Sequence, residues 1–478
     1  MANLGEREGG GSIMLRITRG RGIRRRDFLT LGSLGLAGLA VDCLAGRLAA
    51  SPESESLLRT GRSVVFLFQQ GGPSQFETFD PKPNAPDGVR TVRGVIETKL
   101  PGVHFGDTMS RLARLADRLT LVRSFQTNNG GHNIQPIVGP DSLNANIGSL
   151  YSRVAGATRS DSGMPTNTVI FPDAVCKDVL KGRARGDIAA TGGLGSVYAP
   201  FIPGADGQLQ KDMRLSLPKN TLTARTELAA QLDTLNRALE QSPEFKMLNH
   251  LQRQAYQVLL SGGVADALDL SKEDPRVVAR YDTAAYTRPD GWSKAARGRA
   301  GMYTGHAKAI GKQLLMARRL CEAGCGYVTI HAGYDGVWDM HADGNNLNMV
   351  DGMEAVGPSF DHAVAAFIED IESRGLADKI LLVATGEMGR TPRLNKNGGR
   401  DHWGKLAPLL LYGGGLRGGQ VIGQSTRDGG EPIAEPIGPR HLIATILQSL
   451  LNHGQLRLAP AFGTVSRLTD HPPIPDLI

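Results

Sequence analysis

The chain has 478 residues, of which 40% are hydrophobic and 21% are charged, and this composition is that of a globular protein. Residues 1–50 contain eight arginines and four acidic residues, so they supply +4 of the formal net charge of +7. The +3 that remains for the other residues gives no ground for a nucleic-acid partner. The four cysteines do not indicate a disulfide framework, and the composition leaves the oligomeric state open.

Residues 1–50 are predicted to be an export signal. The run Arg24-Arg25-Arg26-Asp27-Phe28-Leu29 resembles the twin-arginine motif, and the uncharged run from Thr30 to Val41 is too short to predict a membrane span. The alternative, an amphipathic N-terminal helix, is disfavoured by three glycines in that run. We therefore expect the twin-arginine export machinery to deliver residues 51–478, already folded, to the periplasm or cell envelope. The sequence leaves open whether the signal is cleaved.

Predicted strands and helices alternate after the signal, which indicates an α/β fold with a mixed, mostly parallel sheet and helices on both faces. A first helix is predicted to begin at a cap formed by Asp107 and to carry Leu112, Leu115 and Leu119 on one face. Two further helices are predicted over 224–265 and His306–Ala323. The segment 182–207 is expected to be a surface loop, 274–298 a polar break, and Gly413–Gly423 a β-hairpin. The predicted strands are Ser63–Phe68, Leu119–Val122, Thr168–Phe171, Tyr327–Ile330, the apolar run beginning at Ile380, and Leu406–Tyr412.

Acidic residues and histidines gather near three of these strands. Glu387 follows the run that begins at Ile380, Asp339 and His341 follow Tyr327–Ile330, and Asp401 and His402 precede the last strand. Ligands of open α/β sheets bind at the carboxyl ends of the strands. Because oxygen and imidazole ligands together suit a divalent cation, the five residues are predicted to form a metal centre at that edge.

Six sequence motifs are distinctive: Gln70–Ser74, Thr78–Pro83, Trp338–His341, Gly386–Pro392, Gly399–Trp403 and Gly413–Gly423. Together they resemble the motifs of domain-of-unknown-function family 1501, and the resemblance covers residues 60–475. This family is grouped with the alkaline-phosphatase and sulfatase superfamily. The resemblance implies an alkaline-phosphatase-like domain and metal-assisted hydrolysis of sulfate or phosphate esters, with a sulfated or phosphorylated small molecule or glycan as ligand.

The superfamily pattern also implies roles for single residues, and the chain departs from it at two positions. Gln69 or Gln70 stands where an acidic metal ligand is expected, and Met388 replaces an imidazole, so a two-metal centre looks incomplete. A nucleophile is expected in Gln126–Asn133, where Thr127 is the candidate and His132 would contact a leaving group or oxyanion.

Two arginines are candidates for binding an oxyanion, because a guanidinium matches the geometry of sulfate and phosphate. They are Arg390 and Arg400, and Arg390 is assigned to the catalytic residues; the alternative for Arg390 is an ion pair with Glu387. A second function stays open for the whole protein, because Gln70 and Met388 depart from the superfamily pattern: a non-catalytic periplasmic binding or scaffold protein with an eroded metal site.

Overall fold

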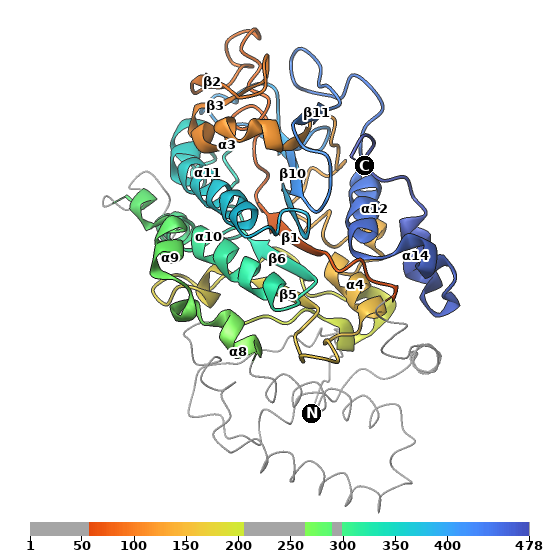
Figure 1. The fold of residues 1–478 in the computed structure, drawn as a ribbon. Coiled ribbons are helices and arrows are strands. Elements are labelled where there is room, and N and C mark those ends of the chain that lie inside the picture. The colour runs from red at the N-terminus through yellow and green to blue at the C-terminus, as the bar shows by residue number, and fades with distance from the viewer. Residues whose placement is uncertain (1–56, 205–262, 289–298, 478) are drawn as a thin grey trace, which may run out of the picture.

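The computed structural model describes residues 57–204, 263–288 and 299–477. Its centre is a seven-stranded sheet with the order β11-β4-β10-β7-β1-β6-β5 (Figure 1). The strands are β1 (Ser63–Phe68), β4 (Thr120–Val122), β5 (Asn167–Ile170), β6 (Tyr327–His331), β7 (Ile380–Thr385), β10 (Leu409–Gly413) and β11 (Gln420–Ile422).

The direction of the strands decides which loops meet. β1 is parallel to β6 and β7, β6 to β5, and β4 to β11, whereas β10 is antiparallel to both of its neighbours, β7 and β4. Phe68 pairs with His331 on one side and with Thr385 on the other, so the three central strands end level. Because β10 is reversed, the residues before it reach the same edge as the residues after β1, β4, β6 and β7.

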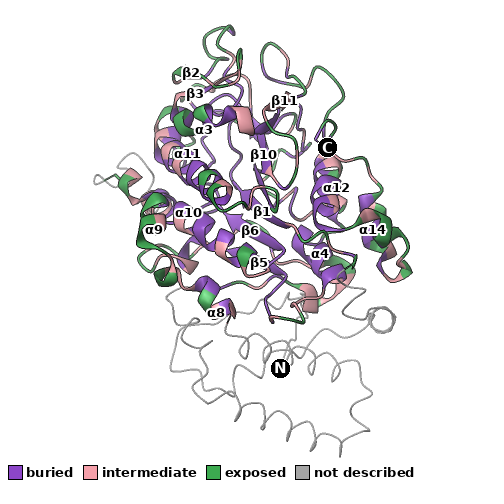
Figure 2. Ribbon diagram, viewed as in Figure 1, coloured by how far each residue is buried: buried purple, intermediate pink, exposed green. Residues whose placement is uncertain are grey.

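Both faces of the sheet are buried, which explains why its strands are continuous apolar runs. Val65 and Leu67 face a core formed with α3 (Ser110–Arg114), α10 (Arg299–Glu322) and α11 (Met349–Ser373). The alternate residues of β1 face α4 (Ile147–Ala155), α12 (Pro439–Leu450) and α14 (Gly463–Thr469). Figure 2 shows the buried strands between these two groups of helices. The structure thus confirms the predicted α/β fold class with its mixed, mostly parallel sheet.

Two local predictions were wrong. Gly413–Gly423 is not a hairpin, because β4 lies between β10 and β11 and pairs with both. Asp107 does not cap a helix: its carboxylate accepts hydrogen bonds from Arg93 and from the backbone of Gly94. Instead, Asp361 of α11 accepts the backbone N–H groups of Arg111 and Leu112 at the start of α3, each at 2.8 Å. Leu119 lies beyond this helix, since a 3₁₀ turn at Ala116–Arg118 separates them.

Short elements complete the described part of the chain. They are β2 (Val95–Glu97), β3 (His104–Gly106), β8 (Gly389–Arg390), β9 (His402–Trp403), α8 (Gly263–Leu268), α9 (Pro275–Arg280) and α13 (His453–Arg457). α9 interrupts the segment that was predicted to be a polar break. The predicted export signal at 1–50 and nearly all of the helix predicted over 224–265 lie outside the described residues. No helix among the described residues is long and apolar enough to cross a membrane.

Candidate metal centre

Asp339 is the centre of a cluster of three histidines at the carboxyl edge of the sheet. Its Oδ2 atom lies 3.0 Å from Nε2 of His132 and 3.1 Å from Nε2 of His341, and its Oδ1 atom lies 3.2 Å from Nε2 of His402. Asp339 is buried, while 20% of the His341 side chain and 28% of the His402 side chain are exposed. Solvent therefore reaches the cluster from the side of these two imidazoles.

The topology of the sheet explains why residues so far apart in sequence meet. Asp339 and His341 follow β6, His132 follows β4, and Glu387 follows β7. His402 belongs to the short β9, which pairs with β8 and precedes the reversed strand β10. All of these positions lie at one edge, so the strand order brings Asp339, His341, His402 and Glu387 together as expected.

The His402 ring is oriented by the backbone. Its Nδ1 atom lies 3.1 Å from the carbonyl oxygen of Gly130, an acceptor that only a protonated Nδ1 can satisfy. In a neutral ring Nε2 then carries a lone pair, and this lone pair faces Oδ1 of Asp339. Two acceptors at this distance repel each other unless a proton or a cation lies between them.

Both ring nitrogens of His132 face a carboxylate oxygen. Nδ1 lies 2.9 Å from Oε1 of Glu387, and Nε2 lies 3.0 Å from Oδ2 of Asp339. Burial alone would lower the pKa of His132, but the hydrogen bonds to Asp339 and Glu387 outweigh it and raise the pKa to about 9. Burial opposes ionisation of Asp339 as well, yet the three imidazoles and Arg390 hold the pKa of Asp339 well below its usual range.

These contacts have the chemistry of a cation site. One ligand atom each from His132, Asp339 and His402 lies within 4.8 Å of the other two. Imidazole nitrogen and carboxylate oxygen are common ligands of zinc and of other first-row transition metals. The backbone carbonyl behind His402 and the carboxylate behind His132 orient the two rings, as the outer partners of metal-bound histidines do. The donor set therefore fits a single divalent cation.

Glu387, predicted as a ligand, lies behind this set and not within it. Its side chain is fully buried, and the backbone N–H of Gly71 donates to both carboxylate oxygens, at 2.9 and 3.2 Å. Its remaining contact is the one with Nδ1 of His132. The geometry therefore makes Glu387 a positioning residue for His132, which itself was predicted to be catalytic and lies among the ligand atoms.

The structure does not bring Asp401 into the cluster. The Asp401 side chain is exposed and accepts a hydrogen bond from the amide of Asn395 at 3.0 Å. Asp401 and His402 are successive residues of extended chain, so their side chains point to opposite sides. A residue that was not predicted, Asn346, lies beside His341 instead of Asp401. Its Nδ2 atom is 3.0 Å from Nε2 of the His341 ring.

The two arginines predicted to bind an oxyanion are fully buried. Arg390 donates to Oδ1 of Asp339 at 2.8 Å and to the carbonyl oxygens of Gly71, Gly72, Trp338 and Arg400. It therefore holds Asp339 and the loop after β1 together, and it does not pair with Glu387. Arg400 donates to Glu77 and to backbone carbonyls, and its guanidinium lies 4.2 Å from the centre of the Phe76 ring.

The remaining candidates lie outside the cluster. The hydroxyl of Thr127 is buried, and its hydrogen bond is a long one, 3.4 Å, from the backbone N–H of Asn129. Gln70 is turned away from Glu387: its amide donates to the carbonyl of Arg185 at 3.1 Å and accepts the N–H of the same residue at 2.9 Å. Met388 is fully buried in the loop after β7.

Sequence reasoning missed three features of this site. It did not identify His132 as a ligand candidate, nor Asn346, nor the orienting contacts from the Gly71 N–H and the Gly130 carbonyl. A single signal was available, since His132 follows the glycine pair Gly130-Gly131 in the loop after a strand. Backbone groups leave no mark in the sequence at all.

Fold and site together define an α/β protein with a candidate metal centre at the carboxyl edge of its sheet. The chain belongs to the family described as a protein of unknown function, DUF1501, which matches residues 61–478. No curated protein matches the chain.

Solved structures of sulfatases and of a phosphonate hydrolase are similar to the chain at low identity. The PsFucS1 sulfatase from Pseudoalteromonas sp. has 10% identity and a TM-score of 0.33, covering 84% of this chain and 72% of that one. The phosphonate monoester hydrolase SpPMH from Silicibacter pomeroyi has 11% identity and a TM-score of 0.27, covering 81% and 73%. Similarity at this level does not bear on activity.

Proposed function

We propose that this protein binds one divalent cation between His132, Asp339 and His402 and hydrolyses a sulfate or phosphate ester there. The observation that carries the proposal is the orientation of His402, whose Nδ1 donates to Gly130 while Nε2 faces Asp339. A divalent cation held by His402 and Asp339 would remove this repulsion. The other arrangement that satisfies the contacts is a protonated ring, and the experiment below separates the two.

Some residues of the site would bind the cation, and others orient those ligands. A divalent cation held there would polarise an ester oxygen and lower the pKa of water at the site. Glu387 fixes the ring of His132, and Arg390 fixes the carboxylate of Asp339. Two imidazoles beside one carboxylate favour a transition metal such as zinc over calcium or magnesium.

Water is the nucleophile in this proposal. None of the hydrogen bonds of His132, Asp339 or His402 involves a serine, threonine or cysteine among the described residues. The exposed sides of His341 and His402 leave an approach for a sulfated or phosphorylated small molecule or glycan. The catalytic role predicted for Thr127 gains no support from its position.

A second candidate function is metal or ligand binding without turnover, in a periplasmic scaffold. The observation in its favour is that the guanidinium groups of Arg390 and Arg400 are both buried and occupied by protein acceptors. Neither is free to neutralise the charge that develops in ester hydrolysis. For both candidates we propose export by the twin-arginine machinery to the periplasm or cell envelope, on the basis of the arginine motif in residues 1–50.

The test combines metal content with turnover, on protein purified from its native export route. His402→Ala removes one ligand from a partly exposed position, so the fold should survive. His453→Ala, at a partly exposed histidine of α13, is the matched control. We expect about one metal ion per chain in the wild type and in the control, and none in His402→Ala.

Turnover of generic aryl sulfates and aryl phosphates then decides between the two functions. If the wild type hydrolyses these esters and His402→Ala does not, the result supports the proposed hydrolysis of sulfate or phosphate esters. Stoichiometric metal without turnover supports the binding protein, and protein without metal in any divalent-metal buffer overturns the metal centre.

A further inference from the structure

We propose that Lys181, Arg183 and Arg185, here called the basic stripe, bind a second oxyanion of the same substrate molecule. The inference rests on the proposed function and deepens it: the substrate would be a polyanion that carries at least two sulfate, phosphate or carboxylate groups. The basic stripe belongs to the loop after β5, and the metal centre does not use it.

The backbone of this loop presents the three cations on one side. Exposure alternates from Lys181 to Arg185: the three basic residues are exposed, and the two residues between them, Gly182 and Ala184, are partly buried. Ala184 packs against the hydrophobic core on the α12 face. A Cβ at Gly182 would lie 2.7 Å from the Cβ of Phe171, so this glycine packs closely against the residue that follows β5. Such alternation is that of an extended chain with one face packed.

The stripe crosses the carboxyl ends of three neighbouring strands in the order of the sheet. After β5, Asp173 accepts the backbone N–H of Gly182 at 2.9 Å. After β6, Asp335 accepts from Arg183 at 2.7 Å. After β1, the side-chain amide of Gln70 makes two hydrogen bonds to the backbone of Arg185, and its Oε1 atom also lies 3.0 Å from Nε2 of His331. Because the order of the strands is β5-β6-β1-β7, the stripe runs toward the strand that delivers Glu387.

Two contacts tie the end of the stripe to the metal centre. A Cβ at Gly186 would lie 3.2 Å from Cγ1 of Ile134, which is two residues after His132. Gln70 directly precedes Gly71, whose N–H holds Glu387. Since neighbouring strands are about 4.8 Å apart, the anchor of Arg183 at β6 lies roughly 10 Å across the sheet from β7. One extended ligand can therefore reach both places.

The charges of the stripe are available to a ligand. Asp335 is the acidic partner of both arginines, with Nε of Arg183 at 2.7 Å and Nε of Arg185 at 3.9 Å. One carboxylate therefore faces two guanidinium groups. The side chains of Arg183 and Arg185 are 70% and 54% exposed, and a guanidinium that uses Nε keeps further donors for a planar oxyanion. The fixed backbone reduces the entropy lost when these side chains bind.

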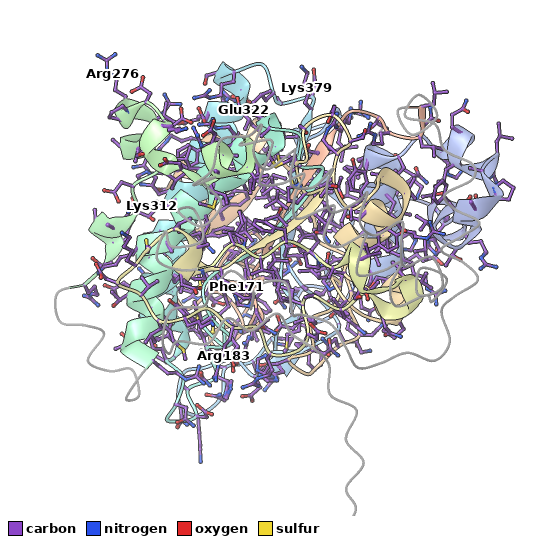
Figure 3. All side chains as sticks on the ribbon, turned by 90° about the horizontal axis from the view of Figure 1, so that it is seen from below. Phe171, Arg183, Arg276, Lys312, Glu322 and Lys379 are labelled. Carbon is purple, nitrogen blue, oxygen red and sulfur yellow. The ribbon has the colours of Figure 1, made fainter. Side chains whose placement is uncertain are left out.

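The experiment measures the affinity for two disaccharides of the same sugars, one with a single sulfate and one with two, by calorimetry at low and at physiological salt. The variant is Lys181→Gln/Arg185→Gln, which leaves Arg183 paired with Asp335 and keeps the backbone anchors. The charge-matched control is Arg276→Gln/Lys379→Gln, at two exposed residues labelled in Figure 3 away from the stripe. Metal content is measured for each protein.

We expect the wild type and the control to bind the disulfated sugar about tenfold more tightly than the monosulfated one, with stronger salt dependence. The Lys181→Gln/Arg185→Gln variant should lose this preference and keep its metal. If this variant still prefers the disulfated sugar, or if the wild type shows no such preference, the proposal that the basic stripe binds a second oxyanion is wrong. The metal-free His402→Ala protein should still bind inorganic sulfate through the stripe, so failure of the metal centre and failure of the stripe give different results.

Discussion

The backbone N–H of Gly71 donates to both carboxylate oxygens of Glu387, which joins the loop after β1 to the loop after β7 beside the metal centre. Glu387 in turn holds Nδ1 of His132. This carboxylate therefore determines which way the imidazole points. In the proposed site Glu387 would support His132 as outer carboxylates support metal-bound histidines.

Replacing Glu387 with glutamine should weaken metal binding while the fold is kept. Glutamine preserves the shape of the side chain, but it removes the charge that makes His132 a stronger ligand. We expect the metal dissociation constant to rise about 10- to 100-fold. Competition with a chelator of known affinity measures it, and Gln455→Glu, at an exposed residue of α13, serves to show that charge elsewhere has no effect. An unchanged dissociation constant would contradict the positioning role.

Alanine at Gly71 should destabilise both the loop and the site. The φ angle of Gly71 is +120°, and an added Cβ would lie 2.7 Å from the backbone nitrogen of Asp339. We expect about 1–2 kcal/mol for the backbone conformation and a further ~1–3 kcal/mol for the clash. Gly61→Ala is the control, because Gly61 has a φ of +78° and no atom within 4 Å of the added Cβ. Denaturant unfolding that gives equal losses for the two variants would argue against the tight packing.

The sequence predicted the sheet better than the site. The strands β1, β6 and β7 are short apolar runs buried on both faces, and their β-branched and aromatic residues favour strands. The order of the strands in the sheet leaves no such pattern, which is why β4 was not expected between β10 and β11. The direction of a side chain beyond a strand depends on the path of the loop, which also leaves no pattern in the sequence. Asp401 and Glu387 were therefore predicted as ligands, although the first faces solvent and the second lies behind His132.

The buried arginines show a second limit of sequence reasoning. Arg390 lies in a glycine-punctuated loop, where an exposed oxyanion-binding role is a reasonable expectation. Its partners are mostly backbone carbonyls from three separate segments, and no residue pattern records them.

Export can be tested independently of the structure. Because the paired arginines are the feature that the export machinery recognises, Arg25→Lys/Arg26→Lys should trap folded protein in the cytoplasm. Cell fractionation with a periplasmic marker measures the effect, and the arginines at 19 and 21 provide a charge-matched control pair. Undiminished export of the Arg25→Lys/Arg26→Lys protein would remove the twin-arginine assignment.

Acid should weaken the fold through Glu273, which receives hydrogen bonds from Arg318, Arg319 and Arg374. Burial acts to raise the pKa of Glu273, but the hydrogen bonds from Arg319 and Arg318 outweigh it and lower the pKa to about 2. A carboxyl group whose pKa is lower in the folded state stabilises the fold above its unfolded pKa of about 4.3, and this stability is lost as the pH falls toward 2.

The comparison that isolates this effect is the difference in Tm between the wild type and Glu273→Gln. We expect the difference to be largest at pH 5–7 and to shrink steadily below about pH 4, because the protonated glutamic acid then resembles glutamine. Other carboxyl groups titrate in both proteins, so their effects cancel in the difference in Tm. A constant difference down to pH 2 would mean that Glu273 has no lowered pKa in the folded protein.

Asp339 should have two separable roles, one in stability and one in metal binding. Asp339→Asn leaves the fully buried Arg390 without its counter-ion, and breaking a buried ion pair costs about 3–5 kcal/mol. Glu77→Gln breaks a comparable buried pair, that of Glu77 with Arg400 at 3.2 Å, neither of which is a candidate metal ligand. Both variants should therefore lose similar free energy of unfolding in the presence of a chelator.

Added metal should distinguish the two variants. At a concentration of 100 times the dissociation constant, a metal ion stabilises the protein that binds it by about 2.7 kcal/mol. We expect this gain in the wild type and in Glu77→Gln but not in Asp339→Asn. If metal stabilises the Asp339→Asn protein as much as the wild type, the cation binds elsewhere, and the three imidazoles around Asp339 are held by protons instead.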